Sequence, residues 1–395
     1  MLPSQYKAIA KTIFGAEELL AADLTALGAT DVQILNRAVS FACNQELLYK
    51  TNLHLACALR ILVPIHQFKA RNEEELYKGV QQIKWPDYFA VNQTFAIDSV
   101  VGSDFFTHSQ YVALKTKDAI ADQFREHTGG ERPSVELNQP DIRIHIHIMG
   151  EDCSVALDSS GESLHKRGYR SGGQHEAPLN EVLAATLVRL SGWDGQSNFT
   201  DPMCGSGTIV TEAALFAMKI APGLLRNYFG FKQWSDFNAP LWEKLCAEAE
   251  TQINHDWEYT VYGSDMEEKY VQLAMDSAEK TGTDEVIKLK TKRFEEAMPP
   301  AGSGVAVFNP PYGERLMGGN NAVNELYKTI GDTLKKNYEG YDVWILSSNM
   351  EAIKHIGLRP SRKISLFNGS LECKFLKFSI YKGSLKAKYQ EQNPK

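Results

Sequence analysis

The sequence predicts an α/β protein in which a larger parallel α/β domain follows two smaller α+β units. From residue 198 onward, short apolar strands alternate with helices, the pattern of a parallel sheet. Residues 1–68 and 69–160 also alternate strands with helices, but in two different orders. The length of 395 residues is too great for one ordinary domain.

The first unit, residues 1–68, is predicted from apolar spacing and helix stop signals. Leu20, Leu24 and Leu27 recur at helical spacing, and Gly28 ends that helix. We expect helices at 15–27 and 45–60, and strands at 9–14, 32–43 (as a pair) and 61–68.

The second unit contains a strictly alternating segment that begins at Asp141. Isoleucine alternates there with polar residues, which predicts a half-buried strand. His145 and His147 lie on its polar face; with no third ligand near in the sequence, we interpret them as a solvated face and expect no metal. We expect helices at 73–83 and 109–128, and strands at 94–100, 141–148 and 153–157.

The segment 161–176 is rich in glycine, serine and basic residues, and it is expected to be a linker or a mobile loop before the parallel domain. A helix with Pro178 near its first turn follows it. A helical insertion is expected within 219–258. We expect strands at 199–202, 260–264, 286–289, 305–309 and 342–347, and a closing antiparallel pair near 363–367 and 374–381.

Composition indicates a soluble globular protein, with 43% hydrophobic and 23% charged residues. No run is long enough for a membrane helix, and the first residues lack a signal-peptide pattern. The six cysteines are scattered without a CxxC pair, which argues against metal and disulfide frameworks and favours a reducing cytoplasm. The net charge of -7 counts against a nucleic-acid partner at first sight, but basic residues cluster at 165–170 and 351–395.

The first motif that indicates chemistry is Asp201-Pro-Met-Cys-Gly-Ser-Gly-Thr208, between a strand and a helix. Glycine lets the backbone approach a ligand closely. The third glycine of a dinucleotide fingerprint is missing, and so is the Gly-Lys-Ser/Thr of a phosphate loop. An acid leading into the turn suits a ligand with a cationic amino-acid end, such as S-adenosylmethionine (SAM).

The second motif, Gly263-Ser-Asp265-Met266, ends the next predicted strand. An acid at that position can accept hydrogen bonds from both hydroxyls of a ribose.

The third motif, Asn309-Pro310-Pro311-Tyr312, is the most specific in the chain. Two prolines stiffen the turn and donate no backbone hydrogen bonds. The Asn309 side-chain oxygen and the Pro310 carbonyl are therefore displayed as acceptors. Accepting both N–H groups of an exocyclic amine steers the nitrogen lone pair toward a methyl sulfonium, so positioning does most of the work. Tyr312 can stack on a base.

These motifs resemble those of the THUMP-containing guanine-N2 methyltransferases that act on bacterial 23S ribosomal RNA. The resemblance rests on residues 201–208 and 309–316, the segment Gly161 to Arg170, and Ala221-Pro-Gly-Leu224. It implies a ferredoxin-like domain at 1–68, a THUMP RNA-binding domain at 69–160, a linker at 161–176 and a Rossmann-like SAM-dependent methyltransferase domain at 177–385.

The family's functional residues are carried over by motif. Asn309, Pro310, Pro311 and Tyr312 are expected to hold the target guanine. Relatives often have an acid near 292–294 to meet the adenine amino group; Arg293 stands there, so a backbone contact or Phe294 is expected to serve instead. The expected SAM-binding residues are Asp201, Cys204, Gly205, Ser206, Gly207, Thr208, Asp265, Met266, Phe294 and Asn309. The expected RNA-binding residues are Lys166, Arg167, Arg170 and Arg315.

The sequence leaves other functions open. The third motif suits any planar exocyclic amine, so an N6-adenine methyltransferase on RNA or DNA is the main alternative, and methylation of a glutamine amide on a protein is another. A non-catalytic RNA-binding or ribosome assembly factor is the alternative from a different class. The expected partner is large-subunit ribosomal RNA, with no membrane and no metal.

Overall fold

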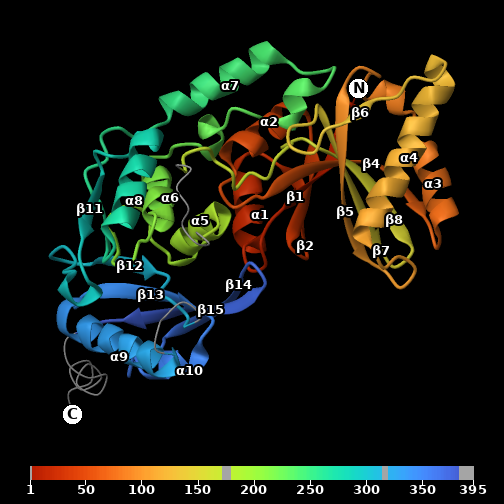
Figure 1. Ribbon diagram of the computed structural model, residues 1–395. Coiled ribbons are helices and arrows are strands. Elements are labelled where there is room, and N and C mark those ends of the chain that lie inside the picture. Colours follow the sequence, from red (N-terminus) through yellow and green to blue (C-terminus); the bar gives the residue numbers. More distant parts are fainter. Residues whose placement is uncertain (1, 171–178, 314–318, 382–395) are drawn as a thin grey trace. The chain divides into compact units, whose positions relative to one another are not determined.

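The structure is a computed structural model that describes residues 2–170, 179–313 and 319–381 (Figure 1). The chain forms two compact units. Unit 1 comprises Met1–Thr12, Ala16–Lys166 and Ala221–Thr251. Unit 2 comprises Ile13–Gly15, Arg167–Ile220 and Gln252–Lys395.

Unit 1 is built on one sheet with the strand order β2-β3-β1-β4-β8-β7-β5-β6. The pairs from β2 to β7 are antiparallel, whereas β5 runs parallel to both β7 and β6. The strands are β1 (Tyr6–Lys11), β2 (Thr30–Leu35), β3 (Ala38–Cys43), β4 (Arg60–Lys69), β5 (Thr94–Gly102), β6 (Ser134–Val135), β7 (Ile142–Met149) and β8 (Asp152–Asp158).

Helices pack on the apolar face of this sheet. Ile144 and Ile146 of β7 are fully buried in one core with Val112 and Phe124 of α4, and Figure 1 shows α3 and α4 beside β5, β7 and β8. Asn44 and Asn72 cap α2 and α3 by accepting a hydrogen bond from the backbone three residues on. The helices are α1 (Glu17–Ala26), α2 (Gln45–His54), α3 (Glu73–Gln81), α4 (Ser109–Thr128) and α7 (Ala239–Thr251), with 3-10 turns η1 (Trp85–Asp87), η2 (Pro222–Leu225) and η3 (Gly230–Gln233).

The predicted insertion within 219–258 packs largely in unit 1, through Ala221–Thr251. Its Trp242 ring lies 5.1 Å from Phe231 and 6.0 Å from Tyr49 of α2, centroid to centroid. A Cβ on Gly223 would lie 2.6 Å from Leu53 Cα, so the backbones meet closely. By its contacts, Ala221–Thr251 therefore groups with unit 1, because apolar side chains pack this segment against α2.

Unit 2 is built on a mostly parallel sheet with the order β11-β10-β9-β12-β13-β15-β14. The strands β11 to β13 are parallel, and β15 pairs antiparallel with both β13 and β14, as the sequence predicts. The strands are β9 (Asn198–Asp201), β10 (Val261–Asp265), β11 (Ile287–Thr291), β12 (Gly304–Phe308), β13 (Tyr341–Ser347), β14 (Arg362–Asn368) and β15 (Leu371–Ser379).

Helices connect β9 to β10, β10 to β11 and β12 to β13, which confirms the predicted α/β class. Tyr327 and Ile330 of α9 are fully buried in one core with Phe308 and Val343 of the sheet. Figure 1 shows α9 and α10 beside β13 and β15. The helices are α5 (Glu181–Leu190), α6 (Thr208–Ala217), α8 (Glu268–Thr281), α9 (Gly319–Asn337) and α10 (Met350–Lys354), with a 3-10 turn η4 (Phe294–Glu296).

Two surface predictions are corrected by burial. His145 is 9% exposed rather than solvated, and burial lowers the pKa of its imidazole to about 4. The described part of the predicted linker, 161–170, is held in place: the Arg226 guanidinium donates to the carbonyls of Ser163 and Lys166 at 2.9 and 2.6 Å. The remainder, 171–176, lies outside the described residues.

Within the described residues, every helix is too short or too polar to span a lipid bilayer.

Candidate active site

The three sequence motifs lie at the carboxyl ends of adjacent parallel strands. β9 lies between β10 and β12, with Gly263 opposite Asp201 and Ala306 opposite Thr200. The chain runs outward from β9 to β10 and β11, then returns to β12 and β13 on the other side. Such a reversal of strand order creates the crevice in which open α/β sheets bind their ligands.

The glycine turn is shaped for close approach of a ligand to the backbone. Gly205 and Gly207 have positive φ angles of 52° and 81°, which residues other than glycine rarely adopt. Gly207 is the N-cap of α6, and a Cβ added there would lie 2.5 Å from the Cβ of Ala274 in α8. The turn is anchored to the next strand because Cys204 N donates to the Ser264 carbonyl at 2.9 Å.

Asp201 and Asp265 form the acidic part of this crevice. Asp201 Oδ1 accepts from Met203 N at 3.0 Å, and Asp265 Oδ2 accepts from Gly205 N at 3.0 Å. Asp201 is only 1% exposed, and burial, reinforced by the nearby Asp265 charge, raises its pKa well above the usual range. A cationic ligand beside the two acids would lower this pKa and favour the ionised form of Asp201. Each carboxylate also keeps lone pairs for ligand hydrogen bonds, so the site fits a ligand that is both cationic and hydroxyl-bearing.

The other expected SAM-binding residues lie around the same turn. Cys204 is 8% exposed, and burial together with the two acids raises the pKa of its thiol, so it is neutral rather than a nucleophile. Ser206 is half-buried in the turn, and Thr208 is a buried residue at the start of α6. Met266, directly after Asp265, is 59% exposed.

Phe294 is placed mainly in the core. Its side chain is 5% exposed, and its ring lies 5.5 Å from Phe308 and 6.2 Å from Tyr338. Both alternatives for the adenine contact, the backbone of this segment and the Phe294 ring, stay predictions.

The Asn309-Pro310-Pro311-Tyr312 turn directly follows β12. Pro310 is buried, Pro311 is exposed, and Asn309 and Tyr312 are half-buried. The Tyr312 hydroxyl donates to the Asn309 side-chain oxygen. Burial raises the pKa of the Tyr312 phenol, which keeps it neutral and able to donate. The Asn309 side-chain oxygen, the acceptor expected for the target amine, thus already accepts a hydrogen bond from Tyr312 of the same turn.

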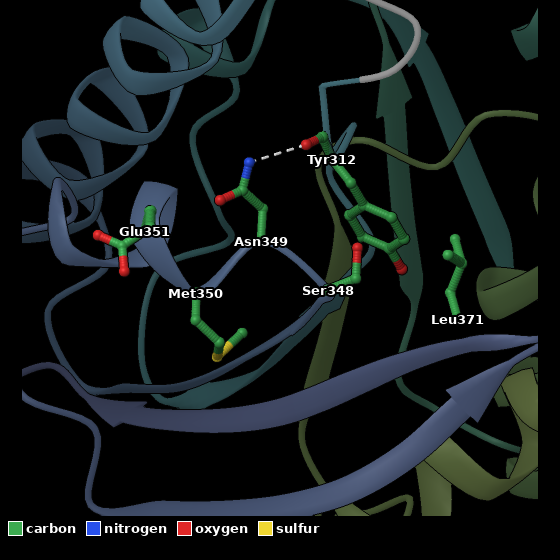
Figure 2. Close-up of a pocket in the computed structure, with 6 residues that line it drawn as sticks. All are labelled: Tyr312, Ser348, Asn349, Met350, Glu351 and Leu371. Carbon is green, nitrogen blue, oxygen red and sulfur yellow. Dashed lines mark hydrogen bonds between the residues drawn. The ribbon is translucent and has the colours of Figure 1, made fainter.

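A cavity of about 360 Å³ opens beside Tyr312 (Figure 2). It is lined by Tyr312, Ser348, Asn349, Met350, Glu351 and Leu371. Sequence reasoning missed this wall, and in particular Asn349, whose amide nitrogen donates to the Tyr312 carbonyl at 3.0 Å. A signal for it exists in the sequence, since Asn349 follows a predicted strand and begins a short helix as an N-cap would.

The expected RNA-binding residues differ in their environments. Arg167 is 1% exposed, and its guanidinium pairs with the buried Glu212 at 3.2 Å, so the RNA contact expected of it would require this ion pair to open. Lys166 is exposed and pairs with Glu162. Arg170 is partly exposed and lies 3.0 Å from Glu181. Arg315 lies outside the described residues.

Among the described residues, no group of three or more His, Cys, Asp or Glu side chains is arranged to bind a metal ion.

Comparison with known families agrees with this arrangement. Residues 167–377 match the family described as "RMKL-like, methyltransferase domain". Residues 70–158 match "THUMP domain" and residues 7–62 match "RlmL ferredoxin-like domain".

Two curated relatives match most of the chain. "Putative RNA methyltransferase slr0064" of Synechocystis sp. is 38% identical over 367 residues, which cover 93% of this chain and 95% of that protein. "Ribosomal RNA large subunit methyltransferase K/L" of Syntrophotalea carbinolica is 38% identical over 376 residues, which cover 93% of this chain and 52% of the relative. The chain therefore spans about half the length of the K/L relative.

Solved structures share the whole architecture. SMU.472, "a putative methyltransferase complexed with SAH", is 31% identical with a TM-score of 0.86, covering 97% of this chain and 100% of that one. A "predicted N6-adenine-specific DNA methylase" from Listeria monocytogenes is 27% identical with a TM-score of 0.83, covering 95% and 96%.

The fold and the chemistry of this sheet edge are those of a SAM-dependent methyltransferase, and SAM is the methyl donor. Within that class, the chain belongs to the RMKL-like methyltransferase family, with THUMP and ferredoxin-like domains before the catalytic domain. The predicted resemblance is confirmed at this level.

Proposed function

We propose that the protein transfers a methyl group from SAM to the exocyclic N2 of a guanine in large-subunit ribosomal RNA. The observation that carries the proposal is the meeting of the acidic glycine turn and the Asn309–Tyr312 turn at adjacent strand ends, on either side of the strand-order reversal. The names of the curated relatives support an RNA substrate and, for the K/L relative, the large ribosomal subunit. The motif resemblance supports guanine N2.

In this proposal, SAM is held by the residues of the glycine turn and the two acids. Asp201 and the 205–207 backbone face the methionine part, and Asp265 accepts from the ribose hydroxyls. SAM supplies an electrophilic methyl group when bound. The positive charge of that ligand stabilises the Asp201 carboxylate, which burial otherwise disfavours.

The target amine is held by Asn309 and Pro310. Accepting its two N–H groups with the Asn309 side-chain oxygen and the Pro310 carbonyl orients the nitrogen lone pair toward the methyl group. The Tyr312 hydroxyl donates to that same Asn309 oxygen in the described structure, so the amine either shares this oxygen, which has two lone pairs, or replaces the hydroxyl on entry. The base must also leave its stack to reach the turn, and Tyr312 then offers an aromatic surface to its face.

The Asn309→Ala variant tests catalysis. We expect it to lose turnover while isothermal titration calorimetry still detects SAM binding, because the acids and glycine turn remain. Wild-type turnover in this variant would overturn the assignment of Asn309.

Nucleoside analysis tests the chemistry of the product. Mass spectrometry of nucleosides from treated large-subunit ribosomal RNA should show N2-methylguanosine. N6-methyladenosine would instead support the adenine alternative, which the Listeria neighbour's name also favours. SAM binding without any methylated nucleoside would support the non-catalytic assembly factor.

RNA capture is proposed for the N-terminal domains, 1–68 and 69–160, and for the exposed Lys166 and partly exposed Arg170. Lys166→Ala should weaken RNA binding. It should also reduce the steepness of log affinity against log salt concentration by about 1, the amount expected for the loss of one phosphate contact. Lys244→Ala is a matched control, since Lys244 is also exposed and also faces a glutamate four residues away. Equal effects of the two variants would contradict a specific role for Lys166.

We also propose a cytoplasmic location. All six cysteines are free thiols in the structure, and five of them are buried, as a reducing compartment permits.

A further inference from the structure

The carboxyl end of β13 lies beside the catalytic turn. β12 and β13 are parallel neighbours, with Phe308 opposite Ile345. Asn309 to Tyr312 follow the first strand, and Ser348 and Asn349 follow the second. The segment that links β13 to α10 therefore reaches the Asn309–Tyr312 turn from the side.

The Asn349 side chain uses both ends of its amide. Its Oδ1 accepts from Ala352 N at 2.9 Å, which caps the start of α10. Its Nδ2 donates to the Tyr312 carbonyl at 3.0 Å, the bond drawn in Figure 2. One amide thus ties the helix start to the catalytic turn.

Asn349 is itself held from the buried side. Its backbone N–H donates to Ser347 Oγ at 3.1 Å, and that oxygen lies 2.8 Å from the Tyr327 hydroxyl of α9. Ser347 and Tyr327 are both fully buried. Buried hydrogen-bonded groups of this kind leave little freedom of movement, so Asn349 presents its Nδ2 from a fixed point.

The Pro310-Pro311 pair explains why such a tie is needed. Neither proline has a backbone N–H, so two of the residues of the turn offer no donor by which the fold can hold it. The Tyr312 carbonyl is an acceptor, and Asn349 supplies the donor. The placement of this peptide sets where the Tyr312 side chain lies relative to the Asn309 side-chain oxygen.

We propose that Asn349 is a positioning residue for methyl transfer: by holding the Tyr312 carbonyl, it fixes the Asn309–Tyr312 turn in the geometry that receives the target amine. This inference rests on the proposed function of that turn. It adds a residue from a fourth strand end, that of β13, to a site otherwise assigned to three sequence motifs.

The substitution Asn349→Asp separates positioning from helix capping. Aspartate caps helices as well as asparagine, so the bond from Ala352 N is kept. The donor to Tyr312 is lost, and a carboxylate oxygen faces the carbonyl instead. Asn44→Asp is the matched control, because Asn44 caps α2 in the same way, accepting from Leu47 N at 2.8 Å, within unit 1.

With SAM and large-subunit ribosomal RNA, we expect Asn349→Asp to lower kcat about 10- to 100-fold, as a misplacement of about 1 Å does. The KM for RNA and the calorimetric Kd for SAM should change less than about threefold, since the groups assigned to binding are untouched. Asn44→Asp should leave kcat unchanged. Asn349→Ser, which keeps a neutral cap but is too short to reach Tyr312, should reproduce the kcat loss if the aspartate variant is unstable.

A wild-type kcat in both Asn349 variants, with Asn309→Ala inactive, would overturn the positioning role and leave the proposed function intact. An equal kcat loss in Asn44→Asp would show a general stability effect and would also overturn it. Full activity of Asn309→Ala would instead overturn the proposed function itself.

Discussion

At the scale of single residues, the backbone geometry of glycine shapes the turn that is expected to bind SAM. Gly207 and Gly282 both have left-handed φ angles, of 81° and 65°. They differ in their surroundings: a Cβ on Gly207 meets Ala274, whereas a Cβ on Gly282 has no atom within 4 Å. The pair therefore separates backbone strain from steric exclusion.

We expect Gly282→Ala to cost about 1 kcal/mol of stability through φ strain alone. Gly207→Ala should cost more, because α6 and α8 must also separate, and it should weaken SAM binding at least about tenfold. Thermal unfolding and SAM titration calorimetry check both values. Equal stability losses, or unchanged SAM affinity in Gly207→Ala, would contradict the close-approach role of this glycine.

His145 gives unit 1 a sensitivity to acid. Burial lowers its pKa to about 4, with Asp98 opposing this shift and Lys11, Arg60 and His147 adding to it. The folded pKa is below that of the unfolded chain, so the contribution to stability is complete above about pH 6.5 and is lost as the pH falls toward 4.

Between pH 7.5 and pH 5, the wild type should lose about 2 kcal/mol more stability than His145→Gln, which cannot take up the proton. Urea unfolding at the two pH values measures the difference. The exposed His108, substituted in the same way, is the control and should behave as the wild type. The same pH dependence in all three proteins would exclude His145 as its source.

At the scale of elements, adjacent basic residues of one segment have opposite roles. Lys166 is exposed and pairs with Glu162 four residues earlier. The next residue, Arg167, is buried and pairs with Glu212 of α6, which also accepts from the Tyr169 hydroxyl at 2.9 Å. The segment thus anchors α6, the helix that begins at the SAM turn.

Arg167→Met should destabilise unit 2 by about 3–5 kcal/mol, because it leaves the Glu212 charge buried without its partner. Lys166→Met should cost less than about 1 kcal/mol. Adding Glu212→Gln to Arg167→Met should recover part of the loss, since the uncompensated charge is removed. Differential scanning calorimetry of the three variants checks this order, and a double variant no more stable than Arg167→Met would contradict it.

At the scale of the whole molecule, the chain order differs from the spatial grouping. Ala221–Thr251 interrupts the methyltransferase sequence between β9 and β10 but packs in unit 1. Its Phe229, Phe231 and Trp242 form an aromatic cluster with Tyr49 of α2. Two segments that are distant in the sequence, α2 and Ala221–Thr251, therefore contribute to the same hydrophobic core of unit 1.

Trp242→Ala should speed amide hydrogen exchange in α2 and in the neighbouring strands of unit 1, with a destabilisation of about 3–5 kcal/mol. Exchange in α6 and β10 should stay unchanged. Mass spectrometry of exchanged peptides measures both regions, and faster exchange confined to unit 2 would contradict the assignment of the insertion to unit 1.

The sequence by itself determined the fold class, most strands and helices, and the three motifs of the sheet edge. These features are local: apolar periodicity selects helix or strand, glycine permits the turn after β9, and the proline pair sets the turn after β12. Because parallel strands end at one edge of a sheet, the strands that the sequence predicted bring the motifs together at that edge.

Only the tertiary structure decided which charges are buried and which distant residues support the site. Lys166 and Arg167 are equally basic in sequence, and only the packing of α6 separates an exposed side chain from a buried ion pair. Asn349 lies 37 residues after Tyr312, and their hydrogen bond exists because β13 pairs with β12. Burial and long-range contacts depend on the order of strands and on the filling of the core, which no local pattern in the chain encodes.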